Sequence, residues 1–339
     1  MKKPSKRHHV VPQFLLERFA KDGLIELVDR HDFTKRRQSG VPTALAQNDF
    51  YTLESDAGRD PAIEKMFADE VEGPAASALR KMIDQRRSST FPALRQSISA
   101  FLAFQFIRGE STRRAIVEEH RAMFQKTALV ATPEILRADI RRRESREPSE
   151  EEVRELWEFA QNTDGYKIVV PNEAEAHLGI ALPIAQELIP LIYDRQWVIL
   201  VFDTPLLLTG DEPVAVVGRR LEPGEAGGGI KLGDEIVFAA DPRHALVLTL
   251  SDEPDEARSG TRRMATIINR HVAFGCHRFI AQTPGLDALK GLALPKKAAP
   301  TQTFGNFVLF NPRLSVDGAA AMKRRVLAMD RARRERLRG

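Results

Sequence analysis

The sequence predicts an α+β fold in which a helical N-terminal half packs on a mainly antiparallel sheet formed by the C-terminal half. Two observations support this prediction. Apolar residues recur at helical spacing through most of residues 1–193, whereas short β-rich runs separated by turn residues dominate the remainder. Helices that come first and strands that come later are typical of α+β proteins rather than doubly wound α/β proteins.

The 339 residues are expected to form three parts. A mainly helical part with a short N-terminal hairpin covers residues 1–193, and a mainly β part of the same compact unit covers residues 194–317. A basic helix covers residues 318–339. A chain of this length can bury a sizeable core without disulfides or metals. No repeat of about 20 to 50 residues is visible, which argues against a solenoid.

The first elements are short. A helix over residues 10–20 is expected to begin at Pro12 and to end at Gly23, because glycine favours helix ends. Residues 24–29 alternate between apolar and polar types, which predicts a half-buried strand. A second extended stretch follows over residues 41–53.

Prolines mark the starts of the longer helices, because proline is favoured in the first helical turn. The expected starting points are Pro61, Pro92, Pro133, Pro148 and Pro171. The apolar face of the second of these helices is expected to continue to Phe124. The helix after Pro148 has glutamates at positions 150–152, which suit the helix dipole, and the last helix is expected to end near Tyr193.

The C-terminal half is predicted to consist mainly of strands. They are expected at residues 197–202, 206–209, 214–217, 235–239 and 245–250. The glycine-rich stretch 224–229 predicts a loop. A helix is expected over residues 261–270 and a further strand over residues 273–280. Residues 276–277, Cys-His, would lie inside that strand with their side chains facing apart, which argues against a nucleophilic Cys–His pair.

Composition excludes several classes of protein. The single cysteine, Cys276, permits neither an intrachain disulfide nor a zinc site built from cysteines. The basic start of the chain is too short and too polar to be a signal peptide. No apolar run reaches the length of about 18 residues that a membrane span needs. These observations predict a cytoplasmic protein without a membrane partner.

The net charge of +4 is mild, but arginines concentrate at residues 137–146 and basic residues at 323–338. A basic helix can bind a nucleic acid backbone, and the segment 323–338 is the candidate for such a contact. The alternative is that both segments are solvated helix faces of mixed charge.

Two adjacent histidines, His8 and His9, open the chain before a Val-Val-Pro-Gln-Phe run. On a regular strand their side chains point to opposite faces, so they cannot both bind one metal ion there. One of them could be a metal ligand or a general base. This opening resembles the general-base histidine segment of HNH-type endonucleases, although the usual asparagine and final histidine are missing at the downstream spacing. The alternative is that both histidines are packed or surface residues.

Three further features carry polar side chains beside apolar runs. Asp211 and Glu212 lie in a Thr-Gly-Asp-Glu-Pro turn, where a carboxylate could bind a metal or where the sequence could simply form a tight turn. Gln105 and Arg108 lie one turn apart on an apolar helix and could bind an anion or tie helices together. The preceding helix carries Glu64, Glu70 and Glu72, of which Glu64 lies beside Ile63 near the apolar stripe, but most such glutamates are expected to be solvated.

Four stretches together resemble a bacterial family catalogued as domain of unknown function 4238. They are His8-His9-Val10-Val11-Pro12-Gln13-Phe14-Leu15, Asp49-Phe50-Tyr51, Phe104-Gln105-Phe106-Ile107-Arg108 and Thr209-Gly210-Asp211-Glu212-Pro213-Val214. In the last stretch, Gly210 and Glu212 replace the family's Ser and Asn, which puts any role of that hydroxyl or amide in doubt. The resemblance covers residues 8–280. It implies a shared site and no particular activity.

The favoured hypothesis is a metal-assisted hydrolase that acts on nucleic acid or another phosphodiester. His8, His9 and Asp211 would be catalytic, with His9 and Asp211 holding a divalent metal. Gln13, Gln105 and Arg108 would contact the substrate. The competing hypothesis is a non-catalytic protein that binds a ligand or partner with the same residues. In either case we expect these side chains to meet in one polar pocket between the two halves, unless they only join the halves structurally.

Overall fold

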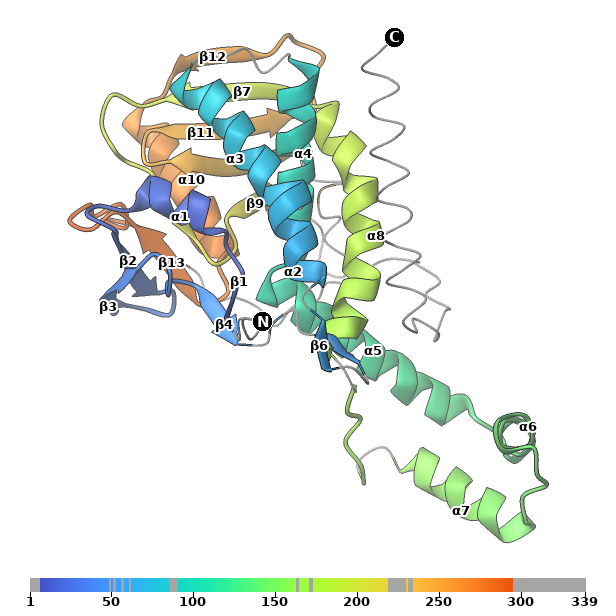
Figure 1. The fold of residues 1–339 in the computed structure, drawn as a ribbon. Helices are drawn as coiled ribbons and strands as arrows, with labels where there is room; N and C mark the ends of the chain where they lie inside the picture. Colours follow the sequence, from blue (N-terminus) through green and yellow to red (C-terminus); the bar gives the residue numbers. More distant parts are fainter. Residues whose placement is uncertain are drawn as a thin grey trace.

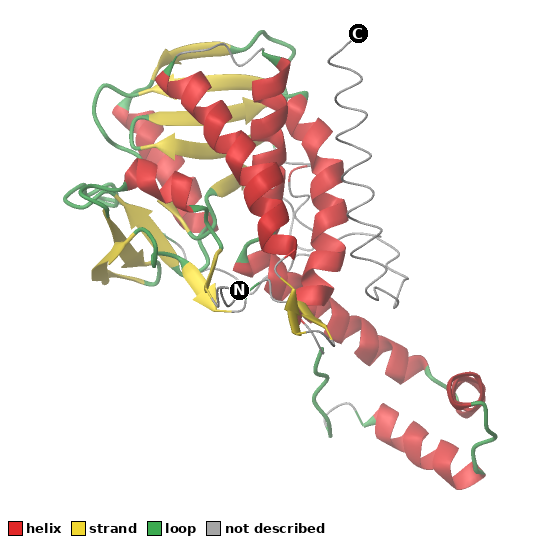
Figure 2. Cartoon of the chain, in the orientation of Figure 1, coloured by secondary structure: helices red, strands yellow, loops and turns green. Residues whose placement is uncertain are grey.

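A computed structural model of the chain confirms the α+β class (Figures 1 and 2). It describes residues 7–48, 50, 53–55, 58–60, 62–85, 91–162, 165–170, 173–218, 230 and 234–294. The expected basic helix at 323–338, the loop at 224–229, and the motif residues Asp49 and Tyr51 lie outside the described residues.

The larger sheet has five strands and is antiparallel except at one edge. Its strand order is β12-β7-β11-β10-β9, with β12 parallel to β7. The strands are β12 (Glu256–Ser259), β7 (Gln196–Val201), β11 (His244–Thr249), β10 (Glu235–Asp241) and β9 (Val214–Val217). All five come from the C-terminal half, as the sequence predicts.

A second, four-stranded antiparallel sheet joins the two ends of the described chain, in the order β3-β2-β13-β8. Its strands are β3 (Asp32–Gly40), β2 (Leu24–Asp29), β13 (Phe279–Gln282) and β8 (Thr209–Gly210). Two small pairs complete the strands: β1 (Arg7–His9) with β4 (Ala46–Asn48), and β5 (Leu53–Ser55) with β6 (Gly58–Asp60).

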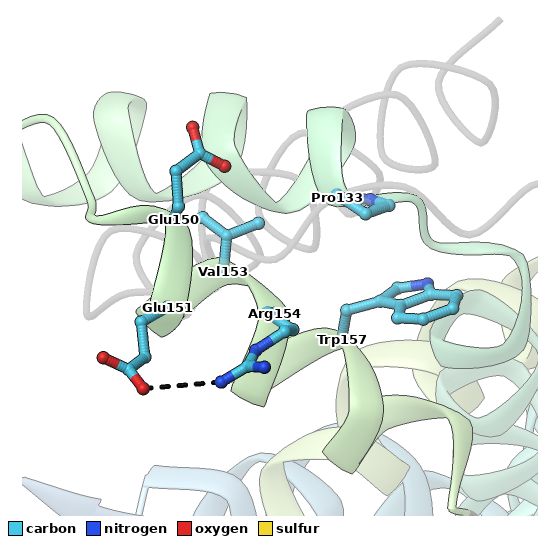
Figure 3. A pocket seen from close by; sticks show the side chains of 6 residues that line it. All are labelled: Pro133, Glu150, Glu151, Val153, Arg154 and Trp157. Carbon is cyan, nitrogen blue, oxygen red and sulfur yellow. Dashed lines mark hydrogen bonds and ion pairs between the residues drawn. The ribbon is translucent and has the colours of Figure 1, made fainter.

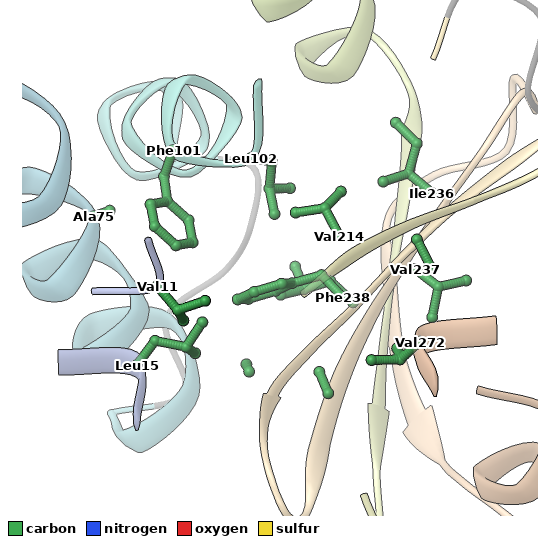
Figure 4. Close-up of a cluster of buried hydrophobic side chains, with 14 of the residues drawn as sticks. Val11, Leu15, Ala75, Phe101, Leu102, Val214, Ile236, Val237, Phe238 and Val272 are labelled. Atoms are coloured by element: carbon green, nitrogen blue, oxygen red, sulfur yellow. The ribbon is translucent and has the colours of Figure 1, made fainter. Parts of the chain in front are cut away.

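Helices cover both faces of the five-stranded sheet. The helices of the body are α1 (Gln13–Phe19), α4 (Pro92–Ile107), α8 (Glu173–Tyr193), α10 (Arg262–Gly275) and a rod of α2 (Ala62–Met66), η1 (Phe67–Glu72), α3 (Gly73–Leu79) and η2 (Arg80–Asp84). Neighbouring residues of β10 point to opposite faces of the sheet, one toward α4 and the other toward α10. Phe238 packs edge-on against Phe101 of α4, with ring centroids 5.8 Å apart, whereas Val237 faces Val272 of α10 (Figure 4).

One hydrophobic core connects these layers and includes residues from Val10 to Leu289. The apolar residues after the histidine pair, such as Val11, Leu15 and Phe19, are completely buried in it. Burial of each such side chain stabilises the fold by about 1.5 to 3 kcal/mol. The N-terminal segment is therefore an integral part of the core.

Three helices project from this body. They are α5 (Glu110–Val130), α6 (Pro133–Glu144) and α7 (Glu150–Gln161), and we refer to them together as the arm (Figure 1). The expected single helix from Pro92 to Phe124 is therefore wrong. It breaks at Arg108 and Gly109, and Phe124 lies half exposed on the arm instead of continuing a core face.

Other local predictions also need correction. α10 continues to Gly275, so the strand expected at 273–280 is shorter and begins at Phe279. Cys276 and His277 consequently lie in the turn between these elements. Strand β3 was not predicted, because its charged residues lack an apolar alternation. In the stretch 206–209 only Thr209 belongs to a strand, and much of the stretch 41–53 is turn.

By length and composition alone, α8 could cross a membrane. Half of its apolar window is buried within the protein, where α8 packs against α4. This burial is consistent with the core helix of a soluble protein.

Candidate functional site

The four stretches on which the family resemblance rests meet at one place, the corner where α4 ends and α5 begins. The corner consists of residues 107–111. The backbone of the histidine segment, the ring of Phe50 and the turn at Asp211 and Glu212 all contact this corner or the first turns of α5. The fold therefore brings together segments that are up to about 200 residues apart in the chain.

Arg108 is the centre of this arrangement and is 1% exposed. Its Nε donates to the carbonyl oxygen of Val10 at 2.9 Å, and its Nη2 donates to the carbonyl oxygen of His9 at 2.6 Å. Its Nη1 donates to Oε1 of Glu72 at 2.7 Å, and the ring of Phe67 lies 5.0 Å below the guanidinium carbon. The guanidinium thus binds its own chain, which argues against the predicted contact with a substrate phosphate.

Gln105 adds a second bond to the same backbone, because its Nε2 donates to the carbonyl oxygen of Val10 at 3.0 Å. The partners of Arg108 on the helical rod, Phe67 and Glu72, are the two ends of η1, a π-helical segment. Such segments alter the direction of side chains relative to a regular α-helix. The predicted pair of Gln105 and Arg108 therefore holds the histidine segment against the helices.

The two histidines face different neighbours, as expected for adjacent residues of a strand. His8 is buried, and its Nε2 lies 3.0 Å from Oε1 of Glu64, which is therefore not merely solvated. His9 is half-buried and accepts a hydrogen bond at Nε2 from the side-chain amide of Gln13, at 2.9 Å. Burial lowers the pKa of His9 below its ordinary value, with an opposing effect of Glu72. His9 is consequently neutral at pH 7.

Asp211 is bound by the turn that follows α10. Its carboxylate accepts backbone hydrogen bonds from His277, Arg278 and Phe279 at 2.7 to 2.8 Å. Burial raises the pKa of this carboxyl group, and the three N–H donors oppose the shift. Its position anchors the turn after α10, so the structure does not bring the Asp211 carboxylate together with His8, His9, Gln105 and Arg108 in one pocket.

The neighbouring residue, Glu212, is the one that reaches the corner. Its Oε1 accepts a hydrogen bond from the backbone amide of Ser111 at 2.8 Å, in the first turn of α5. A carboxylate at this end of a helix satisfies a free N–H group and interacts favourably with the helix dipole. A Cβ at Gly109 would lie 2.0 Å from Oε2 of Glu212, so only glycine permits this approach.

Gly210 faces a comparable restriction on the other side of the turn. A Cβ there would lie 2.2 Å from Sγ of Cys276 and 2.7 Å from the carbonyl oxygen of Phe279. The replacement of the family's serine by glycine therefore fits the buried cysteine packed against it.

Phe50 and His177 close the corner on the α8 side. The Arg113 guanidinium lies 4.8 Å from the Phe50 ring, and its Nη1 donates to the Phe50 carbonyl oxygen at 3.1 Å. The Phe50 ring contacts the His177 imidazole edge-on, and His177 Nε2 lies 2.9 Å from the carbonyl oxygen of Ile107. Complete burial lowers the pKa of His177 to about 4. His177 is therefore a neutral core residue.

Within the described ranges, no group of three or more His, Cys, Asp or Glu side chains could hold a metal ion. The predicted ligands His9 and Asp211 belong to different hydrogen-bond networks. The metal site therefore stays a prediction for which the geometry of these two residues gives no support.

A polar pocket of about 350 Å³ lies beside the histidine segment. It is lined by side chains of β3, β4 and the turn between them: Arg37, Ser39, Thr43, Ala46 and Asn48. His9 is the register partner of Ala46, and directly opposite residues on antiparallel strands point to the same face. His9 therefore shares the strand face that borders this pocket.

The cation at this pocket has no carboxylate partner among the residues that the structure describes. Arg37 is exposed and, among the described residues, makes neither a hydrogen bond nor an ion pair through its side chain. Its guanidinium lies 5.3 Å from the centre of the Phe279 ring, and that of Arg278, also exposed, lies 4.8 Å from the same centre. The Phe279 ring therefore brings two exposed positive charges to one place.

The fold and these contacts define an α+β protein whose N-terminal histidine segment is held by buried side chains of the α4–α5 corner, beside a polar pocket. The sequence model described as "Protein of unknown function (DUF4238)" matches residues 7–285, and the chain therefore belongs to this family. Neither the curated proteins nor the solved structures contain a significant match to this chain.

Sequence reasoning missed several residues that matter at this site. It assigned Glu64 to solvent and gave no special role to Gly109 or His177. The signal for Glu212 was its position beside Asp211, but the sequence does not show which of two adjacent carboxylates faces the corner. Arg37 was missed because it lies in the charged strand that the apolar pattern did not predict.

Proposed function

We propose that this protein binds a phosphate-bearing ligand in the polar pocket between β3 and β4. The observation that carries the proposal is the exposed guanidinium of Arg37 at the wall of that pocket, which has no ion pair in the described part of the chain. An arginine presents several N–H donors in a planar fork that matches the oxygens of a phosphate. The hydroxyl groups of Ser39 and Thr43, which lie 3.2 Å apart, make the same wall polar, although the Thr43 hydroxyl donates to the carbonyl oxygen of Gly40 at 3.0 Å and would have to turn to reach a ligand.

Stacking on Phe279 supports the same assignment. It restricts the guanidinium of Arg37 before a ligand arrives, so less conformational entropy is lost on binding. Arg278 on the same ring adds a second positive charge. A chain of linked phosphates, as in a nucleic acid or another phosphodiester, would contact both arginines.

The test is the binding of a fluorescently labelled single-stranded oligonucleotide, measured by anisotropy at several salt concentrations. Arg37→Gln should weaken binding about tenfold, which corresponds to about 1.4 kcal/mol, and should reduce the salt dependence. The matched control is Arg258→Gln, an exposed arginine on the far edge of the larger sheet. Equal affinity of wild type and Arg37→Gln would contradict the proposal.

Competition by inorganic pyrophosphate distinguishes the two sources of phosphate. If the ligand is a small phosphate compound, pyrophosphate should displace the oligonucleotide at low concentration. If the ligand is a polymer, displacement should require much higher concentrations, because many contacts along the strand contribute.

The second candidate is a hydrolase of the same ligand, and His9 is the observation that favours it. A neutral imidazole bordering a phosphate pocket can act as a general base, and here Nε2 of His9 would do so once the hydrogen bond that it accepts from Gln13 is released. Bis(p-nitrophenyl) phosphate with magnesium or manganese is a suitable substrate for the test. Release of p-nitrophenol that is lost in His9→Asn would support hydrolysis, whereas binding without turnover would leave the non-catalytic function.

The basic C-terminal segment and the cytoplasmic location belong to the same proposal. The basic segment 323–338 would add contacts to a nucleic acid backbone, and its removal should then lower the affinity of the oligonucleotide. A cytoplasmic location in a bacterium fits a ligand of this kind, because nucleic acids and phosphorylated metabolites are abundant there.

A further inference from the structure

The arm carries an unusual share of exposed apolar surface. Of the sixteen large apolar side chains that are exposed in the part of the chain that the structure describes, eight lie on the arm. They are 37% to 71% exposed and comprise Met123, Phe124, Leu129, Val130, Ile135, Leu156, Trp157 and Phe159. Concentrations of this kind mark interaction surfaces, because water disfavours contiguous apolar area.

A cavity on the arm could receive a side chain of the partner. It has a volume of about 510 Å³ and lies along α7 at the start of α6 (Figure 3). Pro133, Val153 and Trp157 form its apolar part, and Glu151 and Arg154, which pair at 3.4 Å, lie beside them. The indole Nε1 of Trp157 donates to the carbonyl oxygen of Ala131 at 3.1 Å, so the ring is fixed in place.

The charges of the arm indicate what kind of partner fits. α6 carries four arginines and three acidic residues, whereas α7 carries five glutamates and one arginine. Many of these charges pair within the arm, but Arg142 and Arg143 share the single carboxylate of Asp139, and Glu155 and Glu158 have no ion pair among the described residues. One arm therefore leaves an excess of positive charge at the end of α6 and of negative charge on α7. A partner that complements this surface must place negative charge opposite α6 and positive charge opposite α7. A second arm related by a two-fold axis does this, because its α7 lies opposite α6 and its α6 lies opposite α7.

We infer that two copies of this chain pair through their arms, with α6 of each copy against α7 of the other. Arg142 and Arg143 at the end of α6, which are 76% and 72% exposed, face the acidic surface of α7 in the other copy. Ile135, 56% exposed on α6, enters the cavity beside Trp157 of the other copy. This pairing is independent of the proposed phosphate pocket, which lies on the body.

The first test is the molar mass in solution, measured by sedimentation over a range of concentrations. Wild type should be a dimer that dissociates on dilution. Ile135→Glu should weaken association at least about tenfold, because it places a charge in the apolar interface. Leu250→Glu is the matched control, since Leu250 is 65% exposed and lies on the body. It should dimerise as wild type does.

Charge exchange provides the decisive test. The double variant Arg142→Glu/Arg143→Glu should not form homodimers, because its α6 is then acidic and faces the acidic α7 of the other copy. The double variant Glu151→Lys/Glu155→Lys should not form them either, because its α7 is then basic and faces the basic end of α6. The mixture of the two double variants should form heterodimers, since both contacts then join opposite charges. All four positions are exposed, so folding is retained.

Three results would overturn the inference. A wild-type chain that stays monomeric at all concentrations means that the arm is covered by another protein or by residues 295–339 of the same chain. Dimers that persist in Ile135→Glu and in both charge variants place the interface elsewhere. Failure of the mixed charge variants to associate, when each alone is monomeric, contradicts the pairing of α6 with α7.

Discussion

Nη1 of Arg108 donates to Oε1 of Glu72 at 2.7 Å, while the other nitrogens of the same guanidinium hold the carbonyl groups of His9 and Val10. A single buried side chain therefore joins the N-terminal strand, the helical rod and the end of α4. The residue that sequence reasoning assigned to a substrate has an evident structural role, because its donors are occupied by the protein itself.

Arg108→Met should destabilise the protein strongly. The substitution leaves Glu72 without its cation and removes the Arg108 donors from the carbonyl groups of His9 and Val10, of which Val10 keeps the bond from Gln105. Breaking a buried pair in this way costs about 3 to 5 kcal/mol. Arg114→Met is the control, because Arg114 is 60% exposed in its pair with Glu110 and should cost less than about 1 kcal/mol. Urea unfolding of both variants checks the difference, and similar losses would refute the structural role.

Glu212 and Gly109 should behave as one unit. Glu212→Ala removes the acceptor at the start of α5 and should cost about 1 to 2 kcal/mol. Gly109→Ala should have a similar effect, because its Cβ displaces the Glu212 carboxylate. The double variant should then cost little more than either single variant. Thermal or urea unfolding of the three variants measures this coupling, and additive losses would show that the contact is not shared.

His177 should make the protein sensitive to acid. Its pKa is about 4 in the folded protein against an ordinary value of 6.5, so the unfolded chain binds a proton between these values and the folded chain does not. The contribution of His177 to the free energy of unfolding is fully present above pH 6.5 and is lost as the pH falls through 4. The total loss is about 3 kcal/mol. His177→Gln should show a smaller loss of unfolding free energy between pH 7 and pH 4.5 than wild type. An unchanged pH profile would contradict the assignment.

The sequence predicted the fold class and most helices because their signals are local. Prolines at helix starts and apolar periodicity require no knowledge of distant residues. The break at Arg108 and Gly109 was not predicted, although Gly109 is a local signal for a helix end. The contact that supports the new helix start, Glu212 with the Ser111 amide, comes from a distant turn and is invisible in the sequence. Strand β3 was missed for a related reason: it is held by pairing with β2 rather than by an apolar pattern.

The site was predicted only in part. The segments around His9, Arg108 and Asp211 were singled out, and the first two meet through backbone carbonyl groups rather than through facing side chains. Sequence cannot show whether a polar side chain binds the backbone of its own chain or a ligand. The roles of Asp211 and Glu212 likewise depend on the direction in which each carboxylate leaves the turn.

The pocket beside His9 should bind phosphate through Arg37, and calorimetric titration with inorganic pyrophosphate at low salt measures this binding without an oligonucleotide. Wild type and Arg258→Gln should release or absorb heat with a saturable, single-site isotherm. Arg37→Gln should bind at least about tenfold more weakly, which is the loss expected for one charge-assisted contact. Absence of binding to wild type, or equal affinity of wild type and Arg37→Gln, would contradict the account.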